Sequence, residues 1–269
     1  MFSPNALAQK AGMGFYQSPL VNQRYNDVIF SQFMGAEMMA RKYGFTREAL
    51  DAYALQSHQR AKRATEAGVF EREIVPVAVR DEHGHPTDVM HTQDEGIRRD
   101  ATLESIASVK LLQEGGLISA ANASQICDGA SGVMVVNERG LRQLGLKPLA
   151  RIHHMSVLGH DPVIMLEAPL PATERALKKS GLSIHDIDLY EVNEAFAPVP
   201  LAWLKALDAD PDRLNVHGGA IALGHPLGAS GTKLMATLVH ALHQQGKRYG
   251  LQTMCEGGGM ANVTLIERL

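Results

Sequence analysis

The chain has 269 residues, 45% of them hydrophobic and 20% charged, an ordinary globular composition that argues against disorder, collagen and coiled coil. Its formal net charge of -3 leaves no basic excess for a phosphate backbone, so we expect no nucleic-acid partner. Two cysteines are too few for a disulfide framework and indicate a reducing compartment. Because no apolar run could span a membrane and the N-terminus does not resemble a signal peptide, we expect no membrane partner and a cytoplasmic location.

Helical periodicity and capping residues organise the first part of the chain. Residues 1–31 lack a sustained period and are expected to form mostly loop. A helix is expected over residues 32–43, and a second one follows the N-cap residue Thr46 and continues to Gly68. The apolar run at residues 74–79 predicts a strand that Pro76 places at a sheet edge. Residues 80–101 are charged and rich in histidine, so we expect a surface loop with little part in the core.

Strands and helices alternate after about residue 130, which predicts an α/β fold. The first expected strand, at residues 132–137, is continuously apolar and therefore predicted to be buried. The other expected strands cover residues 149–157, 187–192, 214–216, 251–255 and 261–267. The expected helices cover residues 138–144, 171–181, 194–207 and 228–246.

Three segments in the last third combine glycines with residues that could carry chemistry: residues 193–197, 215–231 and 255–260. In the second, His225 and Pro226 stand between glycines just ahead of a helix N-terminus, where the backbone can approach a ligand closely. This segment matches neither a P-loop nor a nucleophile elbow. In the third, Cys255 stands before three glycines, so its thiol could act as nucleophile or base beside N–H groups that stabilise an oxyanion. If the fold brings His225 and Cys255 together, they form a proton-transfer couple.

Each of these residues also has an ordinary structural interpretation. A lone histidine is usually a surface or core residue, a lone cysteine is usually a small buried hydrophobe, and glycine clusters mark turns. Cys127 fits the buried interpretation, and Asn193 could be only an N-cap. No metal site is expected, because the histidine pairs lack further ligands: His83 with His85, and His153 with His154.

Taken together, these segments resemble the thiolase family. Residues 224–231 (Gly-His-Pro-Leu-Gly-Ala-Ser-Gly) resemble its histidine motif, and residues 193–197 (Asn-Glu-Ala-Phe-Ala) resemble its asparagine motif. Residues 255–259 (Cys-Glu-Gly-Gly-Gly) resemble its second cysteine motif, and residues 122–130 resemble the segment that carries a serine in contact with coenzyme A, here Ser124. The order and spacing of these motifs agree with the family from about residue 20 to the end.

The resemblance implies an acyltransferase that cleaves 3-ketoacyl-CoA with CoA or runs the reverse Claisen condensation of acetyl-CoA. Acyl-CoA and CoA would be its substrates, and no cofactor is implied. His225 would be the base that activates the nucleophile and helps hold a thioester oxygen, and Cys255 would be the general acid/base. Asn193 would position a water in one oxyanion hole, and the N–H of Gly257 would contribute to the other. Three apolar residues fall where the family lines its acyl and pantetheine pocket: Met34, Met165 and Phe196. Such residues equally suit a core.

The sequence departs from the family pattern because neither Cys127 nor Cys255 occupies the motif of the nucleophilic cysteine. We therefore expect a thiolase-like α/β fold whose N-terminal domain is largely absent. Residues 1–126 would form the loop domain that covers CoA, residues 127–147 the last strand and helix of the N-terminal domain, and residues 148–269 a layered helix–sheet–helix C-terminal domain. An exposed apolar patch is expected at Val133–Val136, because the sheet partners of that strand would be missing.

The expected function is then an incomplete thiolase-type acyltransferase that works as a homo-oligomer or with a complementary thiolase N-terminal half. The alternative is a non-catalytic acyl-CoA-binding or interaction subunit.

Overall fold

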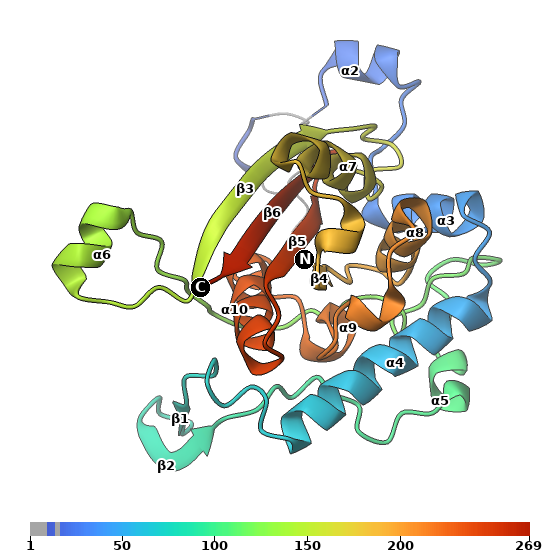
Figure 1. Cartoon of the computed structure of the whole chain (residues 1–269). Coiled ribbons are helices and arrows are strands. Elements are labelled where there is room, and N and C mark those ends of the chain that lie inside the picture. Colours follow the sequence, from blue (N-terminus) through green and yellow to red (C-terminus); the bar gives the residue numbers. More distant parts are fainter. Residues whose placement is uncertain (1–9, 14–16) are drawn as a thin grey trace.

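The computed structural model describes residues 10–13 and 17–269, and Figure 1 shows their arrangement. The helices are α2 (Pro19–Arg24), α3 (Gln32–Lys42), α4 (Arg47–Glu66), α5 (Leu103–Ala107), α6 (Glu138–Leu144), α7 (Pro169–Ser180), α8 (Pro198–Leu207), α9 (Ala220–Leu223) and α10 (Ser230–Gln244), with short 3-10 helices η1 (Ile184–Asp186) and η2 (Pro211–Arg213). The strands are β1 (Val77–Arg80), β2 (Pro86–His91), β3 (Ala150–Gly159), β4 (Leu189–Val192), β5 (Tyr249–Glu256) and β6 (Met260–Arg268). Among the described residues, none of the helices has the length and apolar character needed to cross a membrane.

A four-stranded mixed sheet forms the centre of the C-terminal half, in the order β3–β6–β5–β4. Strand β4 runs parallel to β5, whereas the pairs β5–β6 and β6–β3 are antiparallel. In the parallel pair Val192 lies opposite Thr253, so the carboxyl ends of β4 and β5 meet at one edge of the sheet. Loops that follow parallel strands at such an edge lie close together and commonly form ligand sites.

Helices cover both faces of this sheet, because successive residues of each strand point to opposite sides. On β4, Tyr190 belongs to the core that includes residues of α7 and α8, whereas Leu189 packs with residues of α10. Leu265 and Ile266 of β6 divide between the two faces in the same way. The fully buried Trp203 of α8 lies against Tyr190, with ring centroids 5.1 Å apart. The helix–sheet–helix layering that the sequence predicts is therefore confirmed.

Two capped helices of the N-terminal half, α3 and α4, begin where the sequence predicts. The hydroxyl of Ser31 caps α3 by accepting a hydrogen bond from the N–H of Met34 (3.5 Å), and Thr46 caps α4 through the N–H of Ala49 (3.2 Å). Helix α3 packs on α8, and α4 packs on α9 and α5. The stripe that α4 buries contains two unpredicted polar residues, Asp51 and His58, beside the apolar ones.

Residues 80–101 are more ordered than the sequence analysis expects. Strands β1 and β2 form an antiparallel hairpin in which Ala78 lies opposite Met90, so the prediction of a loop over all of this segment was wrong. Ile97 is buried in a small cluster with residues of α4 and α9. Both features were missed because a hairpin with two exposed faces shows no apolar alternation, and because a single buried isoleucine among charges has no periodic signal.

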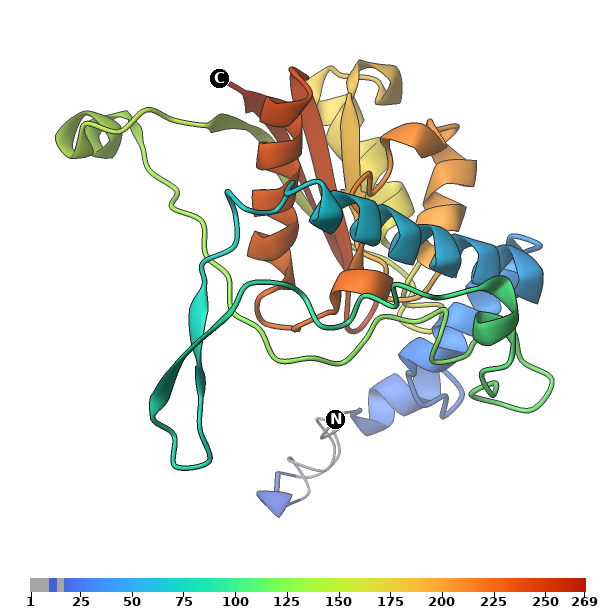
Figure 2. The same cartoon turned by 90° about the horizontal axis from the view of Figure 1, so that it is seen from below.

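The apolar run at residues 132–137 does not form a strand, so this prediction was wrong. In the described part of the chain no strand pairs with it, and Met134 is 72% exposed. Figure 2 shows residues 127–149 as an extended arm that carries α6 away from the sheet. An apolar run is buried only where a partner covers it, and here the expected exposed apolar patch at Val133–Val136 is confirmed.

Smaller differences concern element boundaries. The helix expected from residue 194 begins only at Pro198, whose fixed φ suits the first helical turn. The strand expected at residues 214–216 is reduced to isolated bridges at Leu214 and Val216. Helix α2 lies within the segment expected to be loop, and residues 1–9 and 14–16 of that segment lie outside the described residues.

Candidate active site

Asn193 directly follows β4 at the edge where β4 and β5 end. Its backbone N–H donates to the carbonyl of Thr253 on β5 (3.0 Å), and its side chain is 1% exposed. It is not an N-cap, because α8 begins after Ala197. Its Oδ1 atom is buried and has no hydrogen-bond partner within the described residues. Since buried amide oxygens are nearly always paired, this atom is suited to accept a hydrogen bond from a water or a ligand.

His225 lies in the loop between α9 and α10, with its ring held on both nitrogens. Its Nδ1 is 2.5 Å from Oγ of Ser230, and that hydroxyl also lies 3.0 Å from the carbonyl of Pro226 and can donate to it. With the hydroxyl proton directed to Pro226, Oγ accepts from Nδ1–H, which leaves the lone pair on Nε2. Nε2 is 3.4 Å from Nδ2 of Asn193. The structure therefore brings together two of the predicted site residues.

The electrostatic setting of His225 favours its neutral form. Burial lowers the pKa of the imidazole below its ordinary value, and the positive charge of Lys233 lowers it further. A neutral ring whose Nε2 carries the lone pair can accept a proton at neutral pH.

Cys255 lies near the end of β5, two residues beyond the Thr253 carbonyl that binds Asn193. Its side chain is partly buried, and it is a free thiol. Burial raises the pKa of this thiol to about 12, with a smaller contribution from the charge of Glu256. No hydrogen bond joins Cys255 to His225 or Asn193 in the part of the chain that the structure describes, so their joint action stays a prediction.

Gly257 is exposed in the glycine turn between β5 and β6, and its proposed oxyanion role also stays a prediction. The neighbouring Gly259 has φ +79°, and a side chain there would lie 2.7 Å from the carbonyl of Asp161. The N–H of His160 donates to the carbonyl of Gly259 (2.7 Å). This turn therefore packs closely on the segment that leads to Met165.

Ser124 lies on an extended segment between the two halves of the candidate site. Its N–H donates to the carbonyl of Ala195 (3.0 Å), two residues after Asn193. The next residue, Gln125, accepts a hydrogen bond at its carbonyl from the N–H of His225 (2.9 Å). Ser124 is therefore beside both the asparagine and the histidine segments, and its side chain is partly buried.

The predicted pocket residues lie around α3. Phe196 is buried, and its ring meets that of Phe33 edge-on with centroids 5.7 Å apart. Met34 follows Phe33 and is partly exposed, whereas Met165 is buried with the unusual φ of +51°. Gly35 brings α3 against the segment of Met165, since a side chain at Gly35 would lie 2.7 Å from the carbonyl of residue 164. Met34 therefore lies on α3 itself, Met165 lies on the segment that packs against this helix, and Phe196 contacts the helix through Phe33.

Cys127 is exposed, so the prediction of a small buried hydrophobe was wrong. Its Sγ lies against Gly224, which has φ +82° and no space for a side chain. Gly224 immediately precedes His225. The exposed thiol is therefore close to the histidine loop, which the sequence pattern did not indicate.

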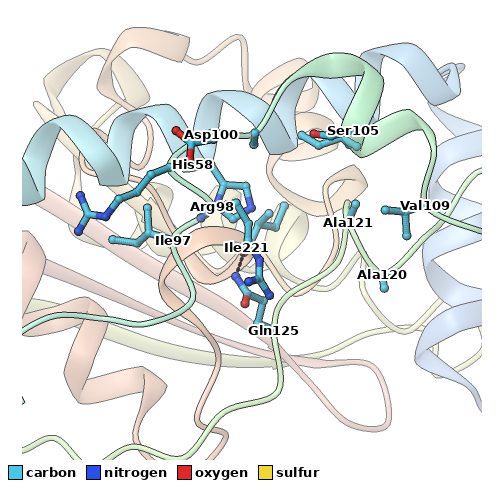
Figure 3. A pocket seen from close by; sticks show the side chains of 13 residues that line it. His58, Ile97, Arg98, Asp100, Ser105, Val109, Ala120, Ala121, Gln125 and Ile221 are labelled. Carbon is cyan, nitrogen blue, oxygen red and sulfur yellow. Dashed lines mark hydrogen bonds between the residues drawn. The ribbon is translucent and has the colours of Figure 1, made fainter.

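A cavity of 680 Å³ is lined in part by the segment that contains Ser124, through Ala120, Ala121 and Gln125 (Figure 3). Its lining comes from α4, from the loop before α5, from α5, from the Ser124 segment and from α9: His58, Ile97, Arg98, Arg99, Asp100, Ala101, Ser105, Ile106, Val109, Ala120, Ala121, Gln125 and Ile221. The amide of Gln125 fixes one wall by donating to the carbonyl of Ile221 (2.7 Å). The backbone N–H of Arg98 donates to Nδ1 of His58 (3.1 Å). Burial, aided by the charge of Arg98, lowers the pKa of His58 to about 4, so its ring is neutral.

The arginines of this cavity are functional candidates that the sequence analysis missed. Arg98 and Arg99 belong to the charged segment that was interpreted as surface loop. In the described part of the chain the Arg98 guanidinium forms no ion pair, whereas Arg99 faces Glu66 at 3.8 Å. The only signal was the pair of adjacent arginines, which is too common on surfaces to mark a site.

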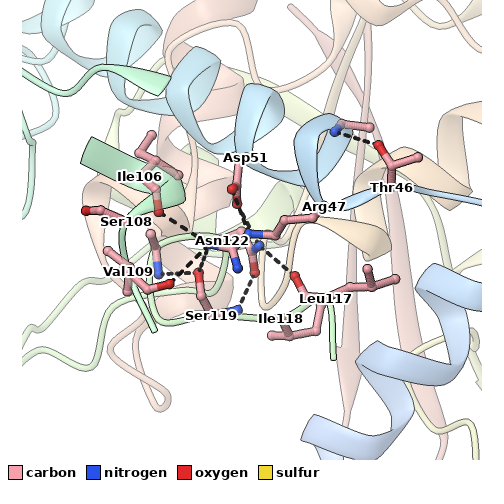
Figure 4. Close-up of polar contacts among 12 residues, drawn as sticks. Thr46, Arg47, Asp51, Ile106, Ser108, Val109, Leu117, Ile118, Ser119 and Asn122 are labelled. Atoms are coloured by element: carbon pink, nitrogen blue, oxygen red, sulfur yellow. Dashed lines mark hydrogen bonds and ion pairs between the residues drawn. The ribbon is translucent and has the colours of Figure 1, made fainter. Parts of the chain in front are cut away.

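A buried polar cluster holds together α4, the residues around α5 and the Ser124 segment, which also line this cavity (Figure 4). Nε of Arg47 donates to Oδ2 of Asp51 (2.6 Å), and Nη2 of Arg47 donates to the carbonyls of Ile106 (3.3 Å) and Val109 (3.2 Å). The other carboxylate oxygen of Asp51 accepts from the amide of Asn122 (2.9 Å). Helix α4 thereby fixes both α5 and the Ser124 segment.

Comparison with family models assigns both halves of the chain. Residues 8–139 match the model described as "Thiolase, N-terminal domain", and residues 146–268 match the model described as "Thiolase, C-terminal domain". The chain belongs to the thiolase family.

Thiolases of several organisms are close relatives of the chain. It is 55% identical over 246 residues to the steroid 3-ketoacyl-CoA thiolase FadA6 of Mycobacterium tuberculosis, covering 91% of this chain and 58% of that protein. It is 44% identical over 252 residues to the acetyl-CoA acetyltransferase of Chromobacterium violaceum, covering 93% of this chain and 64% of that protein. The structure of human mitochondrial 3-ketoacyl-CoA thiolase in complex with CoA superposes with a TM-score of 0.80 at 42% identity, covering 88% of this chain and 58% of that chain.

The matches correct one expectation about this thiolase. The N-terminal model matches residues 8–139. This match does not support a largely absent N-terminal domain, and it supports neither an incomplete enzyme nor a non-catalytic subunit. The physical reason is that the segment interpreted as a separate loop domain is itself matched as part of the N-terminal thiolase domain. The chain spans 58–65% of the length of these curated relatives.

Proposed function

We propose that the chain is a thiolase-type acyltransferase that acts on acetyl-CoA and 3-ketoacyl-CoA by thiolysis or Claisen condensation. One observation carries the proposal: a neutral His225 lies 3.4 Å from Asn193. This pair lies at the edge of the sheet where β5, which contains Cys255, ends. A protein that only binds a thioester has no physical need for a neutral histidine base aligned beside a buried amide. The names of the relatives, which describe thiolases and an acetyl-CoA acetyltransferase, support the same reaction class.

In the proposed mechanism His225 acts first as a base. Its Nε2 lone pair takes the proton of an attacking thiol, while Nδ1–H remains bonded to Ser230. The new Nε2–H then donates to the oxygen of the thioester, and a water bound at the unpaired Oδ1 of Asn193 supports that oxygen. Proton transfer by a positioned group typically contributes about 10²–10⁴-fold.

Cys255 supplies or removes the proton at the second carbon of the acetyl group. Burial raises the pKa of this thiol to about 12, so the thiol can donate a proton at neutral pH, and its thiolate, once formed, is a strong base that can remove one. In thiolysis the sulfur of the attacking thiol bonds to the third carbon, and this new bond replaces the bond between the second and third carbons. The electron pair left on the second carbon takes the proton of Cys255.

The coenzyme A part of the substrate would bind in the cavity of Figure 3. Its apolar wall at Ile97, Ile106 and Ile221 suits the pantetheine or adenine. The guanidinium of Arg98, which forms no ion pair within the described residues, suits a phosphate. Gln125 connects this cavity to the His225 loop, and the neighbouring Ser124 contacts the segment that follows Asn193. Met34, Met165 and Phe196, around α3, remain the proposed lining for the acyl chain.

The nucleophile that the family resemblance implies matches neither cysteine of this chain, so the test addresses the proton-transfer half of the site. The chain is incubated with acetyl-CoA in deuterium oxide, and the loss of the acetyl methyl signal is followed by proton NMR. We expect exchange above the buffer rate, with on the order of 10²-fold loss in Cys255→Ala and His225→Ala. Cys127→Ser is the matched control, because it removes the other thiol, and it should keep the wild-type rate.

Two results would count against this assignment. Exchange that is unaffected by Cys255→Ala would remove Cys255 from the mechanism. Wild-type exchange equal to buffer, under conditions where calorimetry shows bound CoA, would reduce the function to binding.

Three further expectations remain proposals: the division at residues 126 and 147, the assembly and the cytoplasmic location. We propose assembly as a homo-oligomer or with a complementary thiolase polypeptide, supported by the exposed apolar run at Val133–Val136. Light scattering coupled to size exclusion would test it, and a monodisperse monomer at high concentration would refute self-association.

A further inference from the structure

Glu194, which follows Asn193, is a buried carboxylate with donors on both oxygens. It is 1% exposed. Oε1 accepts from the hydroxyl of Tyr53 (2.9 Å) and the amide of Asn215 (3.1 Å). Oε2 accepts from the hydroxyl of Ser57 (2.7 Å) and the backbone N–H of Ile221 (3.0 Å). A carboxylate can accept all four hydrogen bonds at once because it is an acceptor only.

The four donors come from three separate parts of the fold. Tyr53 and Ser57 lie on α4, Asn215 lies in the turn that runs beside β4, and Ile221 lies in the first turn of α9. Figure 1 shows α4 and α9 side by side below the sheet. The carboxylate therefore joins the long N-terminal helix to the two loops that leave the sheet edge.

The glycines before α9 leave the space that this carboxylate and α4 need. A side chain at Gly219 would collide with the carboxyl group of Glu194. Gly218 has φ +83°, and a side chain there would lie 2.7 Å from the carbonyl of Ser57. The N–H of Gly219 also donates to Oγ of Ser57 (3.1 Å).

These contacts fix the two catalytic candidates relative to each other. Asn193 is bonded directly to Glu194 along the backbone, while α9 leads through Gly224 into His225. We propose that Glu194 is the positioning residue that sets the distance between Asn193 and His225. This inference rests on the proposed function, because it assigns a partner to the base and the water-binding amide named there.

A neutral isostere cannot replace the carboxylate. In Glu194→Gln one oxygen becomes an NH₂ group, which must face two donors: either Tyr53 and Asn215, or Ser57 and Ile221. The hydroxyl of Tyr53 or Ser57 can turn and accept from this group, but the amide of Asn215 or the N–H of Ile221 then faces a donor in a buried site, so α9 or α4 must move. A displacement of about 1 Å far from the reacting atoms can cost on the order of 10²-fold in rate.

The experiment measures the geometry of His225 as well as its activity. The imidazole of His225 is followed by NMR in the full chain over a pH titration, with its signal assigned by its loss in His225→Gln. In the wild type its pKa lies below the ordinary value because the ring is buried. In Glu194→Gln we expect the pKa to rise toward the ordinary value, as the loop moves and the ring becomes hydrated, and acetyl-CoA exchange to fall by on the order of 10²-fold.

Glu191→Gln is the matched control. Glu191 is also a buried glutamate on the same strand segment, but its Oε2 has no hydrogen-bond partner within the described residues. This variant should leave the titration of His225 unchanged. If Glu194→Gln does not fold, Ser57→Ala removes one of the four donors and should shift His225 in the same direction by a smaller amount.

The outcomes separate this inference from the proposed function. A folded Glu194→Gln variant with wild-type titration of His225 would overturn the inference, and an equal shift in Glu191→Gln would do the same. A wild-type chain that neither exchanges nor binds CoA would overturn the proposed function, while a shift of His225 in Glu194→Gln alone would still support positioning.

Discussion

Replacing Arg47 with methionine should destabilise the fold and weaken CoA binding together. The substitution keeps much of the apolar stem but removes the cation that faces Asp51 at 2.6 Å. Asp51 is then a buried carboxylate whose remaining side-chain partner is Asn122. The carbonyls of Ile106 and Val109 lose their shared donor at the same time.

The size of the effect follows from how deeply the pair is buried. Breaking a buried ion pair by removing one partner costs about 3–5 kcal/mol, because the remaining charge is uncompensated. The side chain of Asp51 is 3% exposed, but that of Arg47 is 18% exposed, so water can reach part of the site. We therefore take the lower end, about 3 kcal/mol. At about 2–4 °C per kcal/mol this corresponds to a fall in Tm of about 6–12 °C.

Scanning calorimetry and urea unfolding measure the stability, and titration calorimetry measures the dissociation constant for CoA. Arg63→Met is the matched control, since Arg63 is exposed on the same helix, and it should change stability by about 0.5 kcal/mol or less. The double variant Arg47→Met, Asp51→Asn should recover part of the loss, because it removes the orphaned charge. A loss below about 1 kcal/mol for Arg47→Met would refute the reasoning that this pair is structurally required.

Three other substitutions test separate parts of the structure. Gly35→Ala should lower Tm by an amount equivalent to about 1–3 kcal/mol, because the new methyl would lie 2.7 Å from the carbonyl of Ile164. An unchanged Tm would show that α3 can shift freely. Burial raises the pKa of Glu73 from 4.5 to about 7, so the stability that its protonated form contributes is present below 4.5 and lost as pH rises to about 7. Glu73→Gln should therefore raise the free energy of unfolding above pH 7 by on the order of 2 kcal/mol but not at acidic pH, and equal gains at both pH values would contradict this. Met134→Lys should reduce self-association in light scattering without lowering Tm, and unchanged association would exclude the exposed run as its cause.

The features that sequence reasoning predicted are those with a local signal. Thr46 followed by a helical stripe predicted α4, and alternation of apolar segments predicted the layers around the sheet. The motif segments led to Asn193 and His225, which do lie together. Each of these signals is contained within about one element of the chain, where periodicity and capping chemistry apply.

The features that sequence reasoning missed depend on contacts between distant residues. Asn122 and Asp51 are 71 positions apart, and Glu194 and Tyr53 are 141 positions apart. A buried carboxylate and a surface carboxylate look the same in a sequence, so the motif at residues 193–197 contained Glu194 but did not indicate that four donors surround it. At the apolar run near Met134 the prediction was wrong in the opposite sense. The composition of the run predicted burial, but in the described part of the chain no partner covers it.

The order of the strands has a consequence for how the protein is made. Strand β6, the last element of the chain, lies between β3 and β5, and its Arg268 pairs with Ala150. The N–H of Leu269 donates to the carbonyl of Leu149, so even the final residue is part of this pairing. During synthesis β3 must wait, with its backbone hydrogen-bonding groups unpaired, until β6 has been made. A tag or a premature stop at the C-terminal end would therefore affect the middle of the sheet.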